Sequence, residues 1–291
     1  MNRPLPKLEG VEHRYLDLPE LRMHVAEAGA GDPIVLLHGW PQHWWEWRHL
    51  ITPLSERYRV VCPDLRGFGW SEAPASGYEK ERLAADVLSL LDALRLRRVR
   101  LVGHDWGGLV GFVICLRHPE RVERYLALNT GHPFTPVDAR TLRTLWRFWY
   151  QQVIAAPLIG RRLVGSERAW RLLPRSTTEQ RGIWSAYDRD LFLGQLREPE
   201  RAAASVALYR TFILRELLPI ARGRYRYERL RTQTLFLHGT RDPVIRPALL
   251  RGYEEHSDDM TLELVDGAGH FIAEERPRLV LNRALAFFAA G

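Results

Sequence analysis

Asp105 is the residue whose surroundings say most about chemistry. It lies inside the segment Gly103-His-Asp-Trp-Gly-Gly108, which follows an apolar run at 99–102 and precedes a helix-like stretch. Glycines stand two positions before Asp105 and two and three after it, where a tight strand-turn-helix elbow has no room for a Cβ. An aspartate at the tip is ionised at neutral pH and needs no base to activate it. The elbow therefore predicts a carboxylate nucleophile that attacks an sp³ carbon and forms an ester on the enzyme.

Two further polar residues follow apolar runs later in the chain. Asp242 comes shortly after the run at 234–237, and His270 follows the run at 262–265 in a glycine-rich loop. The carboxyl ends of parallel strands open onto one crevice, so these side chains are expected to meet Asp105 there. The order nucleophile, acid, histidine along the chain is that of a hydrolase triad. We expect Asp242 to orient His270, and His270 to activate water.

Backbone amides complete the predicted site. The segment His38-Gly-Trp-Pro41 follows an apolar run at 34–37, so the amide of Trp40 can face the same crevice. The amide of Trp106 lies at the start of the helix after Asp105, and together the two would form an oxyanion hole. Their indoles are then free to line an apolar substrate pocket, with Phe271 beside them. We expect His104 to point away from the site and to be structural.

The elements that position these residues follow from the spacing of apolar runs. From 33 to 129, short apolar runs alternate with helical patterns, which predicts a mostly parallel sheet covered on both faces. Strands are expected at 34–37, 60–62, 99–102, 125–128, 234–237 and 262–265, with an antiparallel hairpin at 13–18 and 21–28 ahead of them. Helices are expected at 80–94 and 277–290. The fold class is α/β.

The strand rhythm stops between 135 and 222, where arginine and tryptophan occur at helical spacing. A sheet that resumes after such an excursion implies one core domain with an inserted helical cap. We predict a first part of the core at 1–131, a cap at 132–231 and the second part of the core at 232–291.

Composition narrows the function classes. The chain has 291 residues, a formal net charge of +7, and two cysteines, Cys62 and Cys115. The cysteine spacing is that of neither a metal site nor a disulfide scaffold, so buried free thiols and no metal are expected. The densest basic segment, 222–231, alternates arginine with tyrosine, and we interpret it as a solvated linker rather than a nucleic acid interface. No stretch has the length of a membrane span and no signal peptide is evident, which predicts a cytoplasmic protein.

These motifs together resemble the α/β-hydrolase-fold epoxide hydrolases over nearly the whole chain. The matching segments are His38-Gly-Trp-Pro41, Trp47-Arg48, Asp64-Leu-Arg-Gly-Phe-Gly-Trp-Ser71, Gly103 to Gly108, Asp242 and Gly269-His-Phe271. The resemblance implies hydrolysis of a small apolar epoxide by water to a vicinal diol, without a cofactor. It also implies two cap tyrosines that donate hydrogen bonds to the epoxide oxygen. Tyr150 is expected to be the first and Tyr209 the second, with Tyr187 as a competitor for the second place.

Two other functions remain open. Haloalkane dehalogenases share the aspartate, and the indole of Trp106 would serve them as a halide ligand. Against this function, those enzymes often carry asparagine or glutamate at the position of Trp40, or an acidic residue at the position of Asn129. A ligand sensor that has kept the pocket without turnover is the remote alternative. The epoxide itself and its stereochemistry are left open, as is the choice between a monomer and a homodimer.

Overall fold

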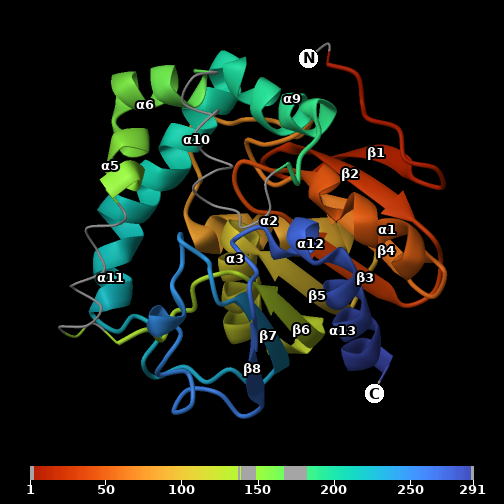
Figure 1. Cartoon of the computed structure of the whole chain (residues 1–291), viewed down its shortest axis with the longest axis vertical. Helices are drawn as coiled ribbons and strands as arrows, with labels where there is room; N and C mark the ends of the chain where they lie inside the picture. The colour runs from red at the N-terminus through yellow and green to blue at the C-terminus, as the bar shows by residue number, and fades with distance from the viewer. Residues whose placement is uncertain (1–2, 137, 139–148, 167–181, 290–291) are drawn as a thin grey trace.

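Eight strands form one sheet in the order β1-β2-β4-β3-β5-β6-β7-β8 (Figure 1). The computed structural model describes residues 3–136, 138, 149–166 and 182–289. The strands are β1 (Glu12–Asp17), β2 (Arg22–Ala28), β3 (Pro33–Leu37), β4 (Arg59–Pro63), β5 (Val99–His104), β6 (Val122–Leu128), β7 (Gln233–Gly239) and β8 (Met260–Val265). Each strand expected from the sequence is present, with ends that differ by up to three residues.

The sheet is antiparallel only at its first edge. β1 pairs with β2 as the predicted hairpin, and β2 runs antiparallel to β4. From β4 onward the neighbouring strands are parallel. Parallel strands place their carboxyl ends at one edge, so the loops that follow β3, β5, β6, β7 and β8 meet there. The loops that carry the candidate site residues therefore lie at one edge of the sheet.

Helices cover both faces of the sheet, as expected for strands that are apolar on both sides. All six residues of the central strand β5 are buried. α2 (Lys80–Ala93) packs against α3 (Asp105–Arg117), and α1 (Arg48–Ser55) packs against α13 (Pro277–Ala289). The short elements η1 (Trp44–Trp47), η2 (Pro119–Arg121), η6 (Pro247–Leu249) and α12 (Ile272–Glu275) complete the core.

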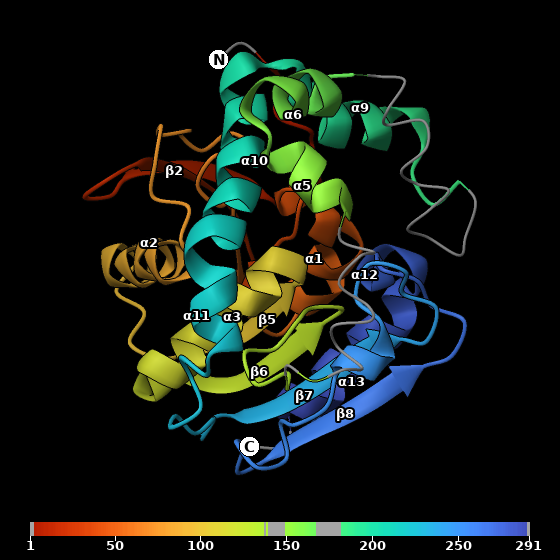
Figure 2. The ribbon, with the colours of Figure 1, turned by 90° about the vertical axis from the view of Figure 1, so that its left-hand side faces the viewer.

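Helices and no strands make up the regular structure of the described residues between β6 and β7, as predicted for a cap. They are α5 (Trp149–Ala155), α6 (Pro157–Val164), α9 (Ala186–Gly194), η4 (Gln195–Arg197), α10 (Pro199–Thr211), the π-helical turn η5 (Phe212–Glu216) and α11 (Leu217–Ala221). α10 packs against α5 and α6, and Figure 2 shows these helices together at one end of the molecule. The parts of the predicted cap at 137, 139–148 and 167–181 lie outside the described residues. The domain boundaries remain predictions.

Cys62 and Cys115 are both buried and free. Among the residues that the structure describes, no helix is both long and apolar enough to cross a membrane. The same residues contain no group of three or more histidine, cysteine or acidic side chains that could hold a metal ion.

Candidate active site

Asp105 occupies the expected elbow between β5 and α3. Its φ is +48°, in the left-handed region that residues with a side chain rarely adopt. Close backbone contacts around it explain the flanking glycines: a Cβ on Gly107 would lie 2.4 Å from the carbonyl oxygen of Leu37, and one on Gly103 would lie 2.7 Å from that of Gly107. The chain therefore holds a strained aspartate in a turn that only glycines can flank, which is typical of a functional position.

The three residues predicted to form a triad are brought together at the carboxyl edge of the sheet. The Nδ1–H of His270 donates to Oδ2 of Asp242 over 2.9 Å. The other ring nitrogen, Nε2, lies 3.9 Å from Oδ1 of Asp105, which leaves the aspartate within reach of the histidine without a direct hydrogen bond. Burial alone would raise the pKa of Asp242, but His270 and His238 lower it below its ordinary value. Asp242 is therefore a stable anion that fixes the tautomer of His270.

Asn129 holds Asp242 in place, a role that we did not predict from the sequence. Its Nδ2 donates to Oδ2 of Asp242 over 2.7 Å and to the carbonyl of Gly269 over 3.0 Å. The amide of Gly239 donates to its Oδ1 over 3.2 Å. One side chain thus ties the loops after β6, β7 and β8 together. The available signal was its position, directly after the apolar run that became β6.

One of the two amides predicted for an oxyanion hole contacts the carboxylate of Asp105. The backbone N–H of Trp40 donates to Oδ2 of Asp105 over 3.0 Å. Trp106 is the second residue of α3, where a backbone N–H has no partner within its own helix. Both amides therefore lie next to Asp105, and Oδ1 is the carboxylate oxygen that Trp40 leaves free; their joint role as an oxyanion hole stays a prediction.

A buried ion pair lies directly behind these loops. Nδ1 of His104 is 2.7 Å from Oε1 of Glu46, and both side chains are inaccessible to solvent. The Nε2–H of His104 donates to the carbonyl of His270 over 2.9 Å, and Oε2 of Glu46 accepts from the amide of Gly39 over 3.1 Å. Burial alone would lower the pKa of His104, but the charges of Glu46 and Asp105 outweigh burial and raise this pKa to about 9. The imidazolium thus donates a hydrogen bond from Nε2 and forms a close ion pair through Nδ1.

This arrangement corrects our expectation for His104. Its ring does not point away from the site: its centroid is 5.1 Å from that of His270. Glu46 was missed altogether, because one carboxylate in the run Trp44-Trp-Glu-Trp47 gives no sign of its partner. Together they connect the loop that carries Trp40 to the loop that carries His270.

Two of the three candidate tyrosines lie near Asp105. Tyr209, on α10, is 3% exposed, and its ring contacts the indoles of Trp40 and Trp106 with centroids 5.1 and 5.4 Å apart. Burial raises the pKa values of Tyr209 and Tyr150, and the charge of Asp105 raises both further. Tyr187 is 55% exposed and packs edge-on against Trp45.

The predicted pocket residues are all buried but have different neighbours. The indole N–H of Trp40 donates to Oγ of Ser205 on α10 over 2.9 Å. The indole of Trp106 packs against Phe212, and its N–H makes no hydrogen bond of normal geometry with any residue that the structure describes. Phe271 lies against His270 and Trp184. Trp40 and Trp106 contact the helix α10, and Phe271 contacts both His270 and Trp184, which lies just before α9.

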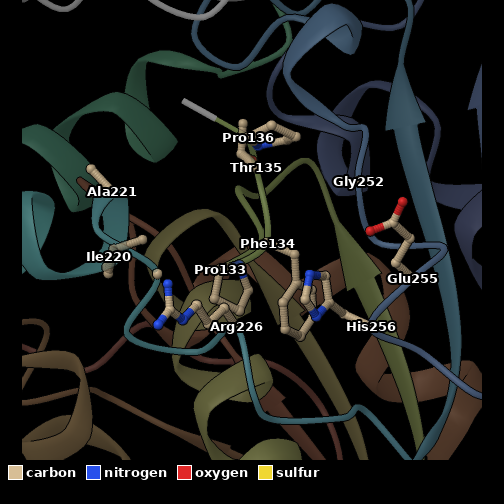
Figure 3. Close-up of a pocket in the computed structure, with 11 residues that line it drawn as sticks. Pro133, Phe134, Thr135, Pro136, Ile220, Ala221, Arg226, Gly252, Glu255 and His256 are labelled. Atoms are coloured by element: carbon tan, nitrogen blue, oxygen red, sulfur yellow. The ribbon is translucent and has the colours of Figure 1, made fainter. Parts of the chain in front are cut away.

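A separate pocket of about 310 Å³ lies between the loop after β6 and the end of α11. Figure 3 shows Phe134 and His256, whose rings are stacked at 4.8 Å, with Ile220 and Arg226 near them. None of the predicted catalytic residues lines this pocket. The pocket is therefore not part of the candidate active site.

Comparison with known proteins agrees with this geometry. Residues 32–277 match the α/β hydrolase fold family. The chain is 30% identical to the soluble epoxide hydrolase of Corynebacterium sp. (strain C12), covering 96% of this chain and 98% of that protein, and 30% identical to epoxide hydrolase 2 of Siraitia grosvenorii, covering 93% and 96%. The structure of the ligand-free epoxide hydrolase CorEH superposes with a TM-score of 0.85 at 30% identity, covering 96% of this chain and 99% of that one. The chain therefore belongs to the α/β-hydrolase-fold epoxide hydrolase family and is an enzyme of the hydrolase class.

Proposed function

We propose that the enzyme hydrolyses an apolar epoxide to a vicinal diol through an ester on Asp105. One observation carries this proposal: a carboxylate at the elbow, within 3.9 Å of a histidine that is paired with a second carboxylate. A serine at this position would need His270 for its own activation, whereas an ionised aspartate does not. His270 is then available for a separate hydrolytic step.

In the first step, Oδ1 of Asp105 attacks one oxirane carbon and the bond from that carbon to the epoxide oxygen breaks. The Trp40 amide holds the other oxygen, Oδ2, and so orients the carboxylate for attack. The departing alkoxide takes a proton from Tyr150 or Tyr209, whose hydroxyls both sense the charge of Asp105. Preorganised donors in a site shielded from water stabilise such a charge more than water does. The products of this step are a hydroxyalkyl ester and a tyrosinate that regains its proton from solvent.

In the second step, Nε2 of His270 removes a proton from water, and the hydroxide adds to the carbonyl carbon of the ester. The negative charge moves to the former Oδ2, where the amides of Trp40 and Trp106 stabilise it. Asp242 stabilises the imidazolium that forms, since it already accepts the Nδ1–H. Collapse of the intermediate breaks the ester bond, and the proton on His270 passes to the diol oxygen. Asp105 is left as a carboxylic acid that loses its proton to solvent, which balances the proton that the tyrosinate took up. No cofactor takes part in either step.

Dehalogenation is the second candidate function, and one feature of the site favours it. The buried indole N–H of Trp106 makes no hydrogen bond of normal geometry to a described residue, so it can donate to a halide that leaves a carbon under attack by Asp105. The two tyrosines favour epoxide opening instead, because a halide leaving group needs no proton.

Intact-protein mass spectrometry of the His270→Gln variant tests both functions. The variant should consume one equivalent of substrate and accumulate the ester, because only the second step needs His270. An epoxide adds its whole mass to the peptide that contains Asp105, whereas a chloroalkane adds only its alkyl group. Absence of any adduct with a substrate that the wild-type enzyme converts would exclude covalent attack by Asp105.

Screening the wild-type enzyme with styrene oxide, a fatty-acid epoxide and a haloalkane identifies the substrate class. A ligand sensor would convert none of them. We further propose that the enzyme acts in the cytoplasm and that residues 132–231 form its cap. We infer no nucleic acid partner.

A further inference from the structure

Lys80, one of only two lysines in the chain, is buried at the first turn of α2. Its side chain is 1% exposed, and its Nζ lies 3.1 Å from Oε2 of Glu216, which is 4% exposed. The other carboxylate oxygen, Oε1, accepts the backbone N–H of Lys80 over 2.7 Å. Glu216 therefore satisfies both the ammonium and a free amide at the start of α2. It does so from the cap, as the last residue of the π-helical turn η5.

The same ammonium rests on an aromatic side chain of the candidate active site. Nζ lies 4.3 Å from the ring centroid of Trp106 and 5.4 Å from that of Phe212. A cation over the face of an indole is held more strongly where water is excluded. Burial lowers the pKa of Lys80, while Glu216 and Asp105 oppose that shift, which shows that the ammonium senses the proposed nucleophile.

Trp106 in turn contacts the proposed acid of the opening step. Its ring packs edge-on against Tyr209, with centroids 5.4 Å apart. Its indole N–H also lowers the pKa of the Tyr209 hydroxyl, although it lies outside normal hydrogen-bond geometry. Tyr209 lies on α10, which continues directly into the turn that ends at Glu216. The ion pair thus constrains both partners, Trp106 from the core and Tyr209 from the cap.

We propose that the Lys80–Glu216 pair positions Trp106 and Tyr209 over Asp105 for opening of the epoxide. The inference rests on the proposed function and assigns Lys80 and Glu216 as positioning residues. The ammonium contacts the indole of Trp106, whereas the backbone amide of Trp106, which serves the second step, is held by the first turn of α3. His270 and Asp242, the other groups of the second step, pair with each other. Loss of the pair should therefore slow formation of the ester and leave its hydrolysis unchanged.

The double variant Lys80→Met/Glu216→Gln is the appropriate test. Removing one partner would leave a buried charge without its counterion and destabilise the fold, whereas removing both charges avoids that penalty. The glutamine oxygen can still accept the backbone N–H of residue 80. In single-turnover experiments with an epoxide that the wild-type enzyme converts, ester formation should fall by about tenfold. The rate at which the ester decays should match that of the wild-type enzyme.

A second ion pair next to Lys80 and Glu216 in sequence provides a matched control. Glu79 and Arg215 form an ion pair at 2.6 Å between the same two segments, but the arginine is 71% exposed and the glutamate 31%. An exposed pair contributes little. Arg215→Gln should therefore leave both rates unchanged. Equal slowing of both steps in the double variant, or slowing of neither, would refute the positioning role.

Hydrogen exchange provides a readout that does not depend on turnover. Amides of residues 206–216 should exchange faster in the double variant than in the wild-type enzyme, and not in Arg215→Gln. Unchanged exchange in the double variant would overturn the proposal even if the enzyme opens epoxides. If the wild-type enzyme opens no epoxide, the proposed function fails, and faster exchange still shows that the pair holds the segment carrying Tyr209.

Discussion

Replacing Glu46 by glutamine should remove the pH dependence that the buried His104 gives to folding. Glutamine keeps an oxygen that can accept the amide of Gly39, so the change is mainly one of charge. Without the carboxylate 2.7 Å away, burial disfavours the imidazolium, and His104 becomes neutral in the folded enzyme. The variant should then fold with a hydrogen bond in place of an ion pair.

The size and direction of the effect follow from the pKa of His104. It rises from 6.5 to about 9 on folding, a difference worth roughly 3 kcal/mol at about 1.4 kcal/mol per pKa unit. The folded protein then binds more protons than the unfolded chain between these values, so stability falls as the pH rises. The contribution is complete below pH 6.5 and is lost as the pH passes through 9.

Urea unfolding of the wild-type enzyme and of Glu46→Gln at several values between pH 6 and pH 10 measures this contribution. The difference in the free energy of unfolding should be largest near pH 6 and should shrink by roughly 3 kcal/mol by pH 10. Comparing the two proteins cancels other titrating groups. A difference that stays constant over this range would refute a charged His104 in the folded state.

Three further predictions concern the proposed site. Asp105→Ala should abolish turnover while the protein still folds, since the change removes the carboxylate from a turn whose φ of +48° is held by the flanking glycines; retention of more than a trace of activity would remove Asp105 as the nucleophile. Tyr150→Phe should slow ester formation by roughly a hundredfold, the usual cost of one oxyanion donor, and Tyr187→Phe should not; the opposite result in stopped-flow kinetics would exchange their roles. Asn129→Gly removes the hydrogen bond to Asp242, while glycine adopts the φ of +37° at this position without strain. Decay of the ester should slow by about tenfold, and an unchanged decay rate would show that Asn129 is dispensable.

The local patterns that predicted the fold are those that depend on neighbours in sequence. The apolar runs at 34–37 and 99–102 became central strands. A strand that is buried on both faces is a continuous apolar run, so its own sequence is enough to predict it. The elbow was predictable for the same reason: the glycines that it requires lie within five residues of Asp105. Parallel topology then placed Asp242 and His270 at the same edge of the sheet.

Contacts between distant segments could not be predicted in this way. Glu46 and His104 are 58 positions apart, and neither sequence neighbourhood indicates a buried ion pair. The sequence showed Asn129 only as a polar residue after a predicted strand. Its hydrogen bonds depend on the positions of the loops after β7 and β8, which the sequence does not reveal. The face of α10 that carries Tyr209 is likewise set by packing, because helical spacing does not say which side meets the core.

Trp40 shows most directly how far residue type and role can diverge. Its proposed role in the oxyanion hole needs only a backbone N–H, so that role gives no reason for tryptophan at this position. The structure supplies one: the indole N–H donates to Ser205 on α10, while the backbone N–H of the same residue donates to Asp105. The large side chain thus attaches the oxyanion loop to the cap helix that carries Tyr209. Residues at the boundary of core and cap therefore serve both parts of the site.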